Sequence, residues 1–248
     1  MGFLSNIFSK QTCELCGKEV GMLSRAKLKD GKFICSDCAK DCSKFFSPTV
    51  YDLEEVKKHM DYMKKQEELY NKEFEPLQNK INTIKYIGGS GLIFADSIGM
   101  FEVKCPKNKE QKVKELFRYD EMMDFKIYVK ENPEGAGYKY QETGVQIKMM
   151  LDAPSTDYHT KHYITKYVKE FTIPVGKNTN DIEGGMVYDH LMKIFGLNSG
   201  TYNMSKIKST YRNLDEINRY FDRDKYSKLA DDAERKVLGK TIEEIYSK

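Results

Sequence analysis

Residues 13–42 read CELCGKEVGMLSRAKLKDGKFICSDCAKDC and hold five of the six cysteines in the chain. They contain two C-x-x-C pairs, Cys13 with Cys16 and Cys35 with Cys38, separated by eighteen residues. A tight turn at each pair aims two sulfurs at one point, and two such turns complete a tetrahedral thiolate shell. The spacing predicts one structural Zn²⁺ per chain, with no open coordination position.

The residues between the two pairs predict a small β-hairpin. Its strands are expected over Met22–Leu28 and Lys32–Ile34, with the turn at Asp30 and Gly31. Gly17 follows the first pair, where a turn of this kind often needs a positive φ.

Two other interpretations of the cysteines are weaker. Disulfides would require an export route, and no signal for one is visible; a thioredoxin-like motif uses a single C-x-x-C in a βαβ setting. Cys38 is expected to begin a helix that runs through Cys42 to Phe46, with Cys42 a small buried side chain and not a ligand. Cys105 is expected to be a strand-end or core thiol.

The first fifty residues or so resemble a treble-clef or zinc-ribbon module. In particular, they resemble a bacterial four-cysteine N-terminal domain family of unknown function. The resemblance rests on the two cysteine pairs, Gly17 and the Asp30-Gly31 turn. It implies a zinc-binding fold and no activity.

Bulk composition limits the classes of function. The 248 residues are 40% hydrophobic and 32% charged, and 41 basic against 38 acidic residues leave a net charge of +3. Because the two signs are interleaved, the composition favours a solvated mixed surface over a nucleic-acid-binding face. No apolar run approaches the length of a membrane span. The start, MGFLSNIFSK, predicts a short amphipathic helix that folds back onto the body, with weak membrane contact at most, so a cytoplasmic protein is expected.

The sequence predicts four segments: a zinc module at 1–50, a bridging helix at 51–80, a β domain at 81–200 and a helical tail at 201–248. Asp52 and Glu55 form a capping box at the start of the bridging helix. An apolar stripe at helical spacing follows, which is expected to pack against the next domain, with dimerisation left open. Its members are Leu53, Val56, Met60, Met63, Tyr70 and Phe74.

Seven short alternating segments predict an antiparallel β domain. They are YIGG (86–89), GLIFA (91–95), GMFEVK (99–104), ELFRYDE (115–121), DFKIYVKE (124–131), GVQIKMML (144–151) and ITKYVKEFTIP (164–174). A helix should follow, starting near Asn180 and Glu183 and ending at a C-cap at Gly196. Two or three polar helices are expected in the tail, the last capped by Thr241 and Glu244.

Seven strands and a closing helix are the element order of a pleckstrin-homology-like (GRAM-like) barrel. The phrases GLIFADSIGMFEV and ELFRYDEMMDFKI are similar to the bacterial versions of that fold, and the resemblance covers residues 81–197. The insert ENPEGAGYKYQETG departs from a compact hairpin. Lipid binding is not carried over, because no loop holds a cluster of three or four basic residues. The predicted fold class is therefore α+β: a small N-terminal zinc module, a bridging helix, an antiparallel PH-like β-barrel with a capping helix, and a helical C-terminal tail.

Motifs that would carry catalysis were not found. His159 and His162 lie in a polar stretch with no assignable third ligand, and His59 and His190 lie on predicted helices without a catalytic neighbour. An acidic cluster between strands is expected to be a solvated turn; its members are Asp120, Glu121 and Asp124. No nucleophile elbow or metalloprotease motif is present, so an enzyme is not expected.

The sequence favours a non-catalytic protein-interaction or regulatory adaptor with a structural zinc site and a protein partner. The alternative is a zinc-dependent nucleic-acid-binding regulator that uses basic residues of the hairpin, and the third class is an enzyme with its site in the β domain. Those basic residues are Arg25, Lys27, Lys29 and Lys32.

Overall fold

A computed structural model describes residues 10–82, 90–104, 112, 114–131, 141–150, 168–177, 182–197 and 211–246. Several predictions fall outside these residues. They are the N-terminal amphipathic helix, the strand at 86–89, the environment of Cys105, and the stretch with His159 and His162.

The chain divides into two compact units. The first contains the described residues up to Glu68 together with Lys112, Lys114 and Glu115. The second contains the described residues from Leu69 onward, apart from those three. Each unit has its own buried side chains and is described separately.

Two short antiparallel strand pairs build the first unit around the cysteines. Strand β1 (Gln11–Thr12) pairs with β2 (Glu19–Val20), and β3 (Arg25–Lys27) pairs with β4 (Phe33–Cys35). A 3₁₀ turn, Met22–Ser24, precedes β3, so the first hairpin strand is shorter than predicted.

The predicted hairpin turn at Asp30-Gly31 is confirmed. Leu28 N–H donates to Lys32 O over 2.8 Å. Gly31 has a φ of +84°, a conformation that glycine adopts without strain.

The predicted helix from Cys38 to Phe46 is wrong. Helix α1 spans only Ser36–Ala39, and Cys35 is its N-cap, with Sγ accepting a hydrogen bond from Cys38 N–H. The helix starts earlier than expected because a cysteine thiolate can cap it as a Ser or Asp would. It ends after one turn, and single-turn hydrogen bonds carry the chain onward, such as Cys42 N–H to Ala39 O at 3.2 Å.

Helix α2 (Leu53–Leu69) confirms the predicted helix and its capping box. Asp52 N–H donates to Glu55 Oε2, and Glu55 N–H donates to Asp52 Oδ1, both over 2.9 Å. The helix continues into a π-helical turn, η3 (Tyr70–Phe74). The predicted stripe is buried along its length, except that Met60 is half-buried.

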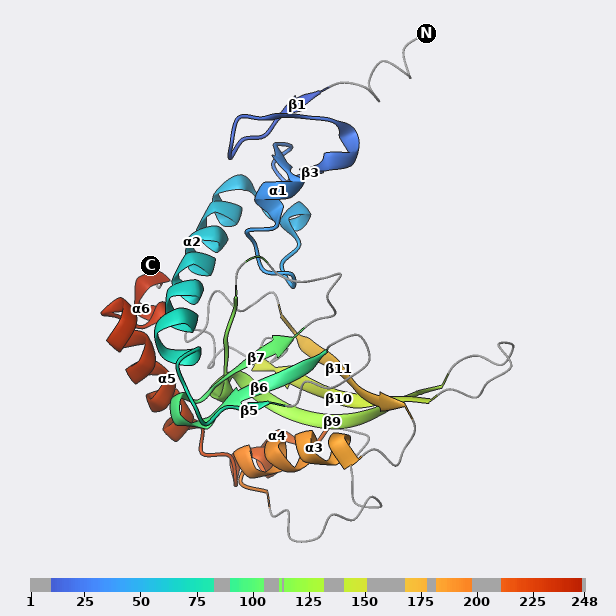
Figure 1. Ribbon diagram of the computed structural model, residues 1–248, viewed down its shortest axis with the longest axis vertical. Helices are drawn as coiled ribbons and strands as arrows, with labels where there is room; N and C mark the ends of the chain where they lie inside the picture. Colours follow the sequence, from blue (N-terminus) through green and yellow to red (C-terminus); the bar gives the residue numbers. More distant parts are fainter. Residues whose placement is uncertain are drawn as a thin grey trace. The chain divides into compact units, whose positions relative to one another are not determined.

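The strands of the second unit form two separate antiparallel sheets and not the closed barrel predicted from the sequence. The first sheet has the order β5-β6-β7-β8 and the second β11-β10-β9 (Figure 1). The strands are β5 (Ile81–Asn82), β6 (Gly91–Ala95), β7 (Met100–Lys104), β8 (Phe117–Arg118), β9 (Met122–Glu131), β10 (Gln141–Met149) and β11 (Glu170–Lys177). Among the described residues no hydrogen-bonded strand pair joins the two sheets, and turn η7 (Tyr119–Glu121) separates β8 from β9.

Aromatic side chains pack the two sheets against each other. Phe101 on β7 and Phe117 on β8 both contact Phe171 on β11, with ring centroids 5.9 and 4.6 Å apart in edge-to-face geometry. All three rings are fully buried. Edge-to-face contacts of this kind add to the gain from burying the rings.

Helix α3 (Ile182–Ile194) contacts both sheets. The ring of His190 is 4.6 Å from that of Phe94 on β6, and Tyr188 packs edge-on against Phe125 on β9. The helix follows β11, which overlaps the last predicted strand segment, and it lies beside β9 and β10 (Figure 1). Its predicted C-cap is confirmed, because Gly196 has a φ of +64°.

The opposite face of the four-stranded sheet is covered by helices. Residues from the end of α2, from η3 and from α5 (Arg223–Leu238) form one apolar cluster with β6 and β7. The buried members are Leu69, Tyr70, Phe74, Ile93, Ala95, Ile98, Met100, Leu116, Ala230 and Ala233. An ion pair between Lys236 on α5 and Glu73 on η3, 2.6 Å long, lies at the edge of this cluster.

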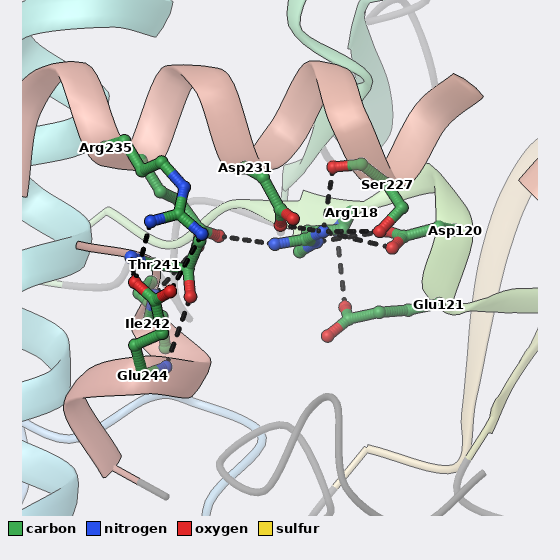
Figure 2. A network of polar contacts seen from close by, with 10 residues as sticks. Arg118, Asp120, Glu121, Ser227, Asp231, Arg235, Thr241, Ile242 and Glu244 are labelled. Atoms are coloured by element: carbon green, nitrogen blue, oxygen red, sulfur yellow. Dashed lines mark hydrogen bonds and ion pairs between the residues drawn. The ribbon is translucent and has the colours of Figure 1, made fainter. Parts of the chain in front are cut away.

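A buried ion network fastens α5 to the strands (Figure 2). Arg118 makes a bidentate pair with Asp120, donating to both carboxylate oxygens over 3.0 Å. Its other contacts reach α5, with Glu234 Oε1 at 3.0 Å and Asp231 Oδ1 at 2.7 Å. Glu234 Oε2 also accepts Ile242 N–H at the start of α6 (Ile242–Tyr246). Burial raises the pKa of Glu234 in spite of the guanidinium beside it.

The predicted solvated acidic turn is therefore wrong. Asp120, Glu121 and Asp124 are all buried. Glu121 Oε2 accepts the backbone N–H of Arg118 over 3.3 Å, and Asp124 pairs with Arg212 over 2.6 Å. These carboxylates can be buried because arginine side chains and backbone amides donate hydrogen bonds to them.

The described part of the C-terminal segment contains three helices, in agreement with the two or three predicted. It consists of α4 (Leu214–Asn218), α5 and α6. Thr241 and Glu244 form the predicted capping box at α6, with bonds of 3.0 and 3.1 Å. Within the described part of the chain, no helix has the combination of length and hydropathy that crossing a bilayer requires.

Candidate metal centre

Each cysteine pair is placed by a local turn. Cys13 N–H donates to Lys18 O and Gly17 N–H donates to Cys13 O, both over 2.8 Å. Gly17 has a φ of +73°, as the sequence predicts, and a Cβ there would meet nothing within 4 Å. The glycine is therefore required for its backbone conformation and not for space. The second pair lies at the end of β4 and in α1, with Cys35 as the N-cap.

The four thiols of Cys13, Cys16, Cys35 and Cys38 converge, with all sulfurs within 4.8 Å of one another. Cys13 Sγ is 3.9 Å from Cys38 Sγ, and Cys16 Sγ is 3.8 Å from Cys35 Sγ. Four sulfurs at about 2.3 Å from a zinc ion form a tetrahedron with edges of about 3.8 Å. The arrangement is compatible with a single metal ion, and an all-sulfur set favours zinc.

Backbone amides point at two of the sulfurs. Cys35 N–H donates to Cys13 Sγ over 3.2 Å, and Cys38 N–H donates to Cys35 Sγ over 3.3 Å. Such bonds stabilise negative charge on sulfur. Burial raises the pKa of Cys13, but amide hydrogen bonds, first that of Cys35, outweigh it and lower the pKa to about 6. Burial and the neighbouring thiols raise the pKa of Cys38.

This geometry has the properties of a closed structural site. Cys13 and Cys35 are only 1% and 3% exposed, Cys38 is half-buried and Cys16 is exposed. The five described cysteines are free thiols. Four sulfurs complete a tetrahedral shell, so a bound ion would have no position left for substrate.

Cys42 lies outside this cluster. Its side chain is buried, and burial raises its pKa to about 12. A thiol in such surroundings is unreactive at neutral pH. The residue has the environment of a small core side chain.

A stack of rings in the first unit was not anticipated from the sequence. The ring of His59 on α2 lies 3.8 Å from Phe46 at an interplanar angle of 4°, and Phe46 stacks on Tyr51 at 4.3 Å. His59 Nε2 accepts the N–H of Ser43 over 3.0 Å. Burial lowers the pKa of His59 to about 3, so the ring is neutral.

Asp30, which the sequence identifies only as part of a turn, also makes a contact with α2. Its Oδ2 accepts Leu53 N–H over 3.2 Å, and its Oδ1 accepts Lys32 N–H over 3.3 Å. The hairpin turn is thereby attached to the first turn of α2. The pattern D-G before a strand signals the turn, but nothing local in sequence signals the bond to residue 53.

The basic residues of the hairpin are only partly available. Arg25 is half-buried, with its guanidinium 4.8 Å from the ring of Phe33, and Lys32 pairs with Asp30 over 3.2 Å. Lys27 and Lys29 are exposed on either side of the buried Leu28.

A further polar cluster lies in the second unit. His190 Nε2 and Tyr119 Oη both contact Asp96 Oδ1, at 3.0 and 2.8 Å. Burial raises the pKa of Asp96, but the hydrogen bonds with His190 and Tyr119 and the neighbouring positive charges together outweigh it, so the pKa is lowered. The cluster ties α3 to the turns η5 (Asp96–Ile98) and η7. It does not share residues with the four-cysteine centre.

Comparison with known proteins gives one match. A family model described as a domain of unknown function (DUF4428) matches residues 12–66. The match includes the four cysteines and runs through the ring stack into α2. No curated protein and no solved structure matches the chain. Residues 12–66 are thus similar to a family whose function is unknown.

Proposed function

We propose that the chain is a non-catalytic cytosolic adaptor, and that its N-terminal module folds around one structural Zn²⁺. The ligands would be Cys13, Cys16, Cys35 and Cys38. The observation that carries the proposal is the pair of sulfur–sulfur distances, 3.8 and 3.9 Å, which equal the edge of a zinc tetrathiolate. Bound zinc would supply folding free energy, because few apolar side chains are available within the small module.

Elemental analysis of the purified protein tests the metal. One zinc per chain is expected in protein prepared without chelators. Cys35→Ser should lose the zinc, whereas Cys42→Ser, a matched buried change outside the ligand set, should keep it. Iron in place of zinc, or zinc retained by Cys35→Ser, would contradict the proposed site.

The adaptor role is supported by how the buried ionisable groups are used. In the described residues, the only group with three or more potential metal ligands is the four-cysteine cluster. The buried arginine–carboxylate pairs and the His190–Asp96 contact each join elements of the second unit. Ionisable groups used in this way stabilise the fold, and a stable fold can serve as a scaffold for protein recognition.

Affinity purification from the source organism with quantitative mass spectrometry tests the adaptor role. A partner that requires the zinc module should be recovered with wild type and Cys42→Ser, and lost with Cys35→Ser. Recovery of the same proteins with all three variants would contradict a role for the module.

We further propose that the second unit is a relative of the pleckstrin-homology-like (GRAM-like) domains. Support comes from the element order, with sheets of four and three strands followed by a helix that contacts both. An experimental structure of the unit would test this relation by superposition of the seven strands and α3.

A further inference from the structure

The 3₁₀ turn before β3 presents two adjacent apolar side chains to solvent. Met22 is 55% exposed and Leu23 is 102% exposed. Five large hydrophobic side chains are exposed in the described part of the chain, and these are the two that adjoin each other. The pair is called the apolar tip below.

The backbone holds the apolar tip in place. Ser24 N–H and Ser24 Oγ both donate to Gly21 O, over 3.2 and 3.3 Å. On one side Val20 pairs with Gln11, and on the other Arg25 pairs with Cys35. A tip that is already ordered loses little conformational entropy when it binds.

Most of the charged residues that flank the apolar tip in the sequence are basic, so the tip lies within a positively charged stretch. Residues 10–32 contain six basic and three acidic residues, and 6 − 3 = +3 equals the formal charge of the whole chain. A bound zinc tetrathiolate would carry a charge of −2 and would offset part of this positive charge. The positive charge available to a partner is therefore that of exposed lysines that form no ion pair. Within the described residues, Lys18, Lys27 and Lys29 are exposed and form no ion pair.

We propose that the apolar tip docks on an anionic lipid bilayer. Met22 and Leu23 would enter the boundary between headgroups and acyl chains, while Lys18, Lys27 and Lys29 meet anionic headgroups. The apolar side chains of the tip match the acyl chains of the bilayer, and the basic side chains match its anionic headgroups. The site is distinct from the four-cysteine centre, and the inference does not depend on the adaptor role.

Vesicle flotation with the full chain tests the proposal. Binding is expected to vesicles of equal parts phosphatidylglycerol and phosphatidylcholine and not to phosphatidylcholine alone, and it should weaken as salt is raised. Leu23→Glu should lower the partition coefficient at least about tenfold, since burying a leucine is worth one or more factors of ten. Val50→Glu is the matched control, because Val50 is 59% exposed in the same unit and the variant introduces the same charge. It should lower the partition coefficient less than Leu23→Glu, since only the electrostatic part of binding is affected.

Three results would overturn the inference. One is equal binding of Leu23→Glu and wild type; another is an equal loss in Val50→Glu. The third is a sedimentation-velocity dimer that Leu23→Glu dissociates, with no vesicle binding, which would assign the tip to self-association. Because Leu23 has no packing to lose, the circular dichroism and melting of the variant should match wild type, which separates loss of binding from loss of folding.

Discussion

Replacing His59 should remove an acid sensitivity from the first unit. In the folded protein burial lowers the pKa of His59 from 6.5 to about 3. Below pH 6.5 the unfolded chain therefore takes up a proton that the folded chain does not. This contribution to stability is complete above pH 6.5 and falls as the pH falls toward 3.

The size of the effect follows from the two pKa values. Between pH 8 and pH 5, His59 should cost the folded state about 2 kcal/mol, from about 1.36 kcal/mol for each pH unit below the unfolded pKa. Because pH 5 lies well above the folded pKa, the loss is set almost wholly by the unfolded value. All other ionisable groups are the same in wild type and variant, so their contribution cancels in the difference.

Hydrogen exchange of the α2 amides in the full chain, corrected for intrinsic rates, measures this stability. Wild type should lose about 2 kcal/mol more protection free energy than His59→Gln over that pH interval. The glutamine oxygen can still accept the Ser43 amide, so folding should survive. As a check independent of the variant, the His59 ring resonance of wild type should not titrate above pH 5. Parallel pH profiles, or a ring that titrates near 6.5, would refute the reasoning.

Three other perturbations have defined outcomes. Chelation of zinc should expose the amides of β3, β4 and α1 in hydrogen exchange and leave those of β6 and β7 protected, because the second unit has its own core. Arg118→Met should destabilise the second unit by about 3–5 kcal/mol in urea unfolding, since Glu234 is left buried without its partner, whereas loss of the exposed Arg235 should matter little. Gly196→Ala should lower the melting temperature more than Gly239→Ala. Both have positive φ, but a Cβ at Gly196 would lie 2.5 Å from a backbone oxygen and one at Gly239 would meet nothing.

The features that could be predicted from sequence are those encoded by neighbouring residues. The capping boxes at Asp52 and Thr241 each depend on residues three apart, and both have the expected bonds. Strand β6 (Gly91–Ala95) matches the predicted segment GLIFA because continuous apolar residues bounded by turns identify a buried strand. The cysteine cluster was also predictable, since each pair is local and the interval between pairs is typical of metal sites.

The features that escaped prediction depend on partners far along the chain. Asp120 is an acidic residue between strands, which usually means a solvated turn, but the network that buries it includes Glu234, 116 residues from Arg118. His59 is neutral because burial lowers its pKa. Its Nε2 accepts the amide of Ser43, whose position relative to α2 is set by the fold of the module. The division of the strands into two sheets likewise depends on which strands pair, and periodicity does not encode pairing.

Helix α5 shows that composition alone does not predict which side chains of a helix are buried. Its sequence, RDKYSKLADDAERKVL, is rich in charge and predicts one of the polar helices of the tail. Yet its buried face contains Tyr226 and three small residues, Ser227, Ala230 and Ala233, together with Glu234. Small side chains let the helix backbone approach the sheet closely, and the approach places Glu234 where Arg118 can neutralise it. The polar residues on this face therefore do not weaken the helix's attachment. They select the one register in which the carboxylate meets the guanidinium, because any other register would bury one of the two charges unpaired.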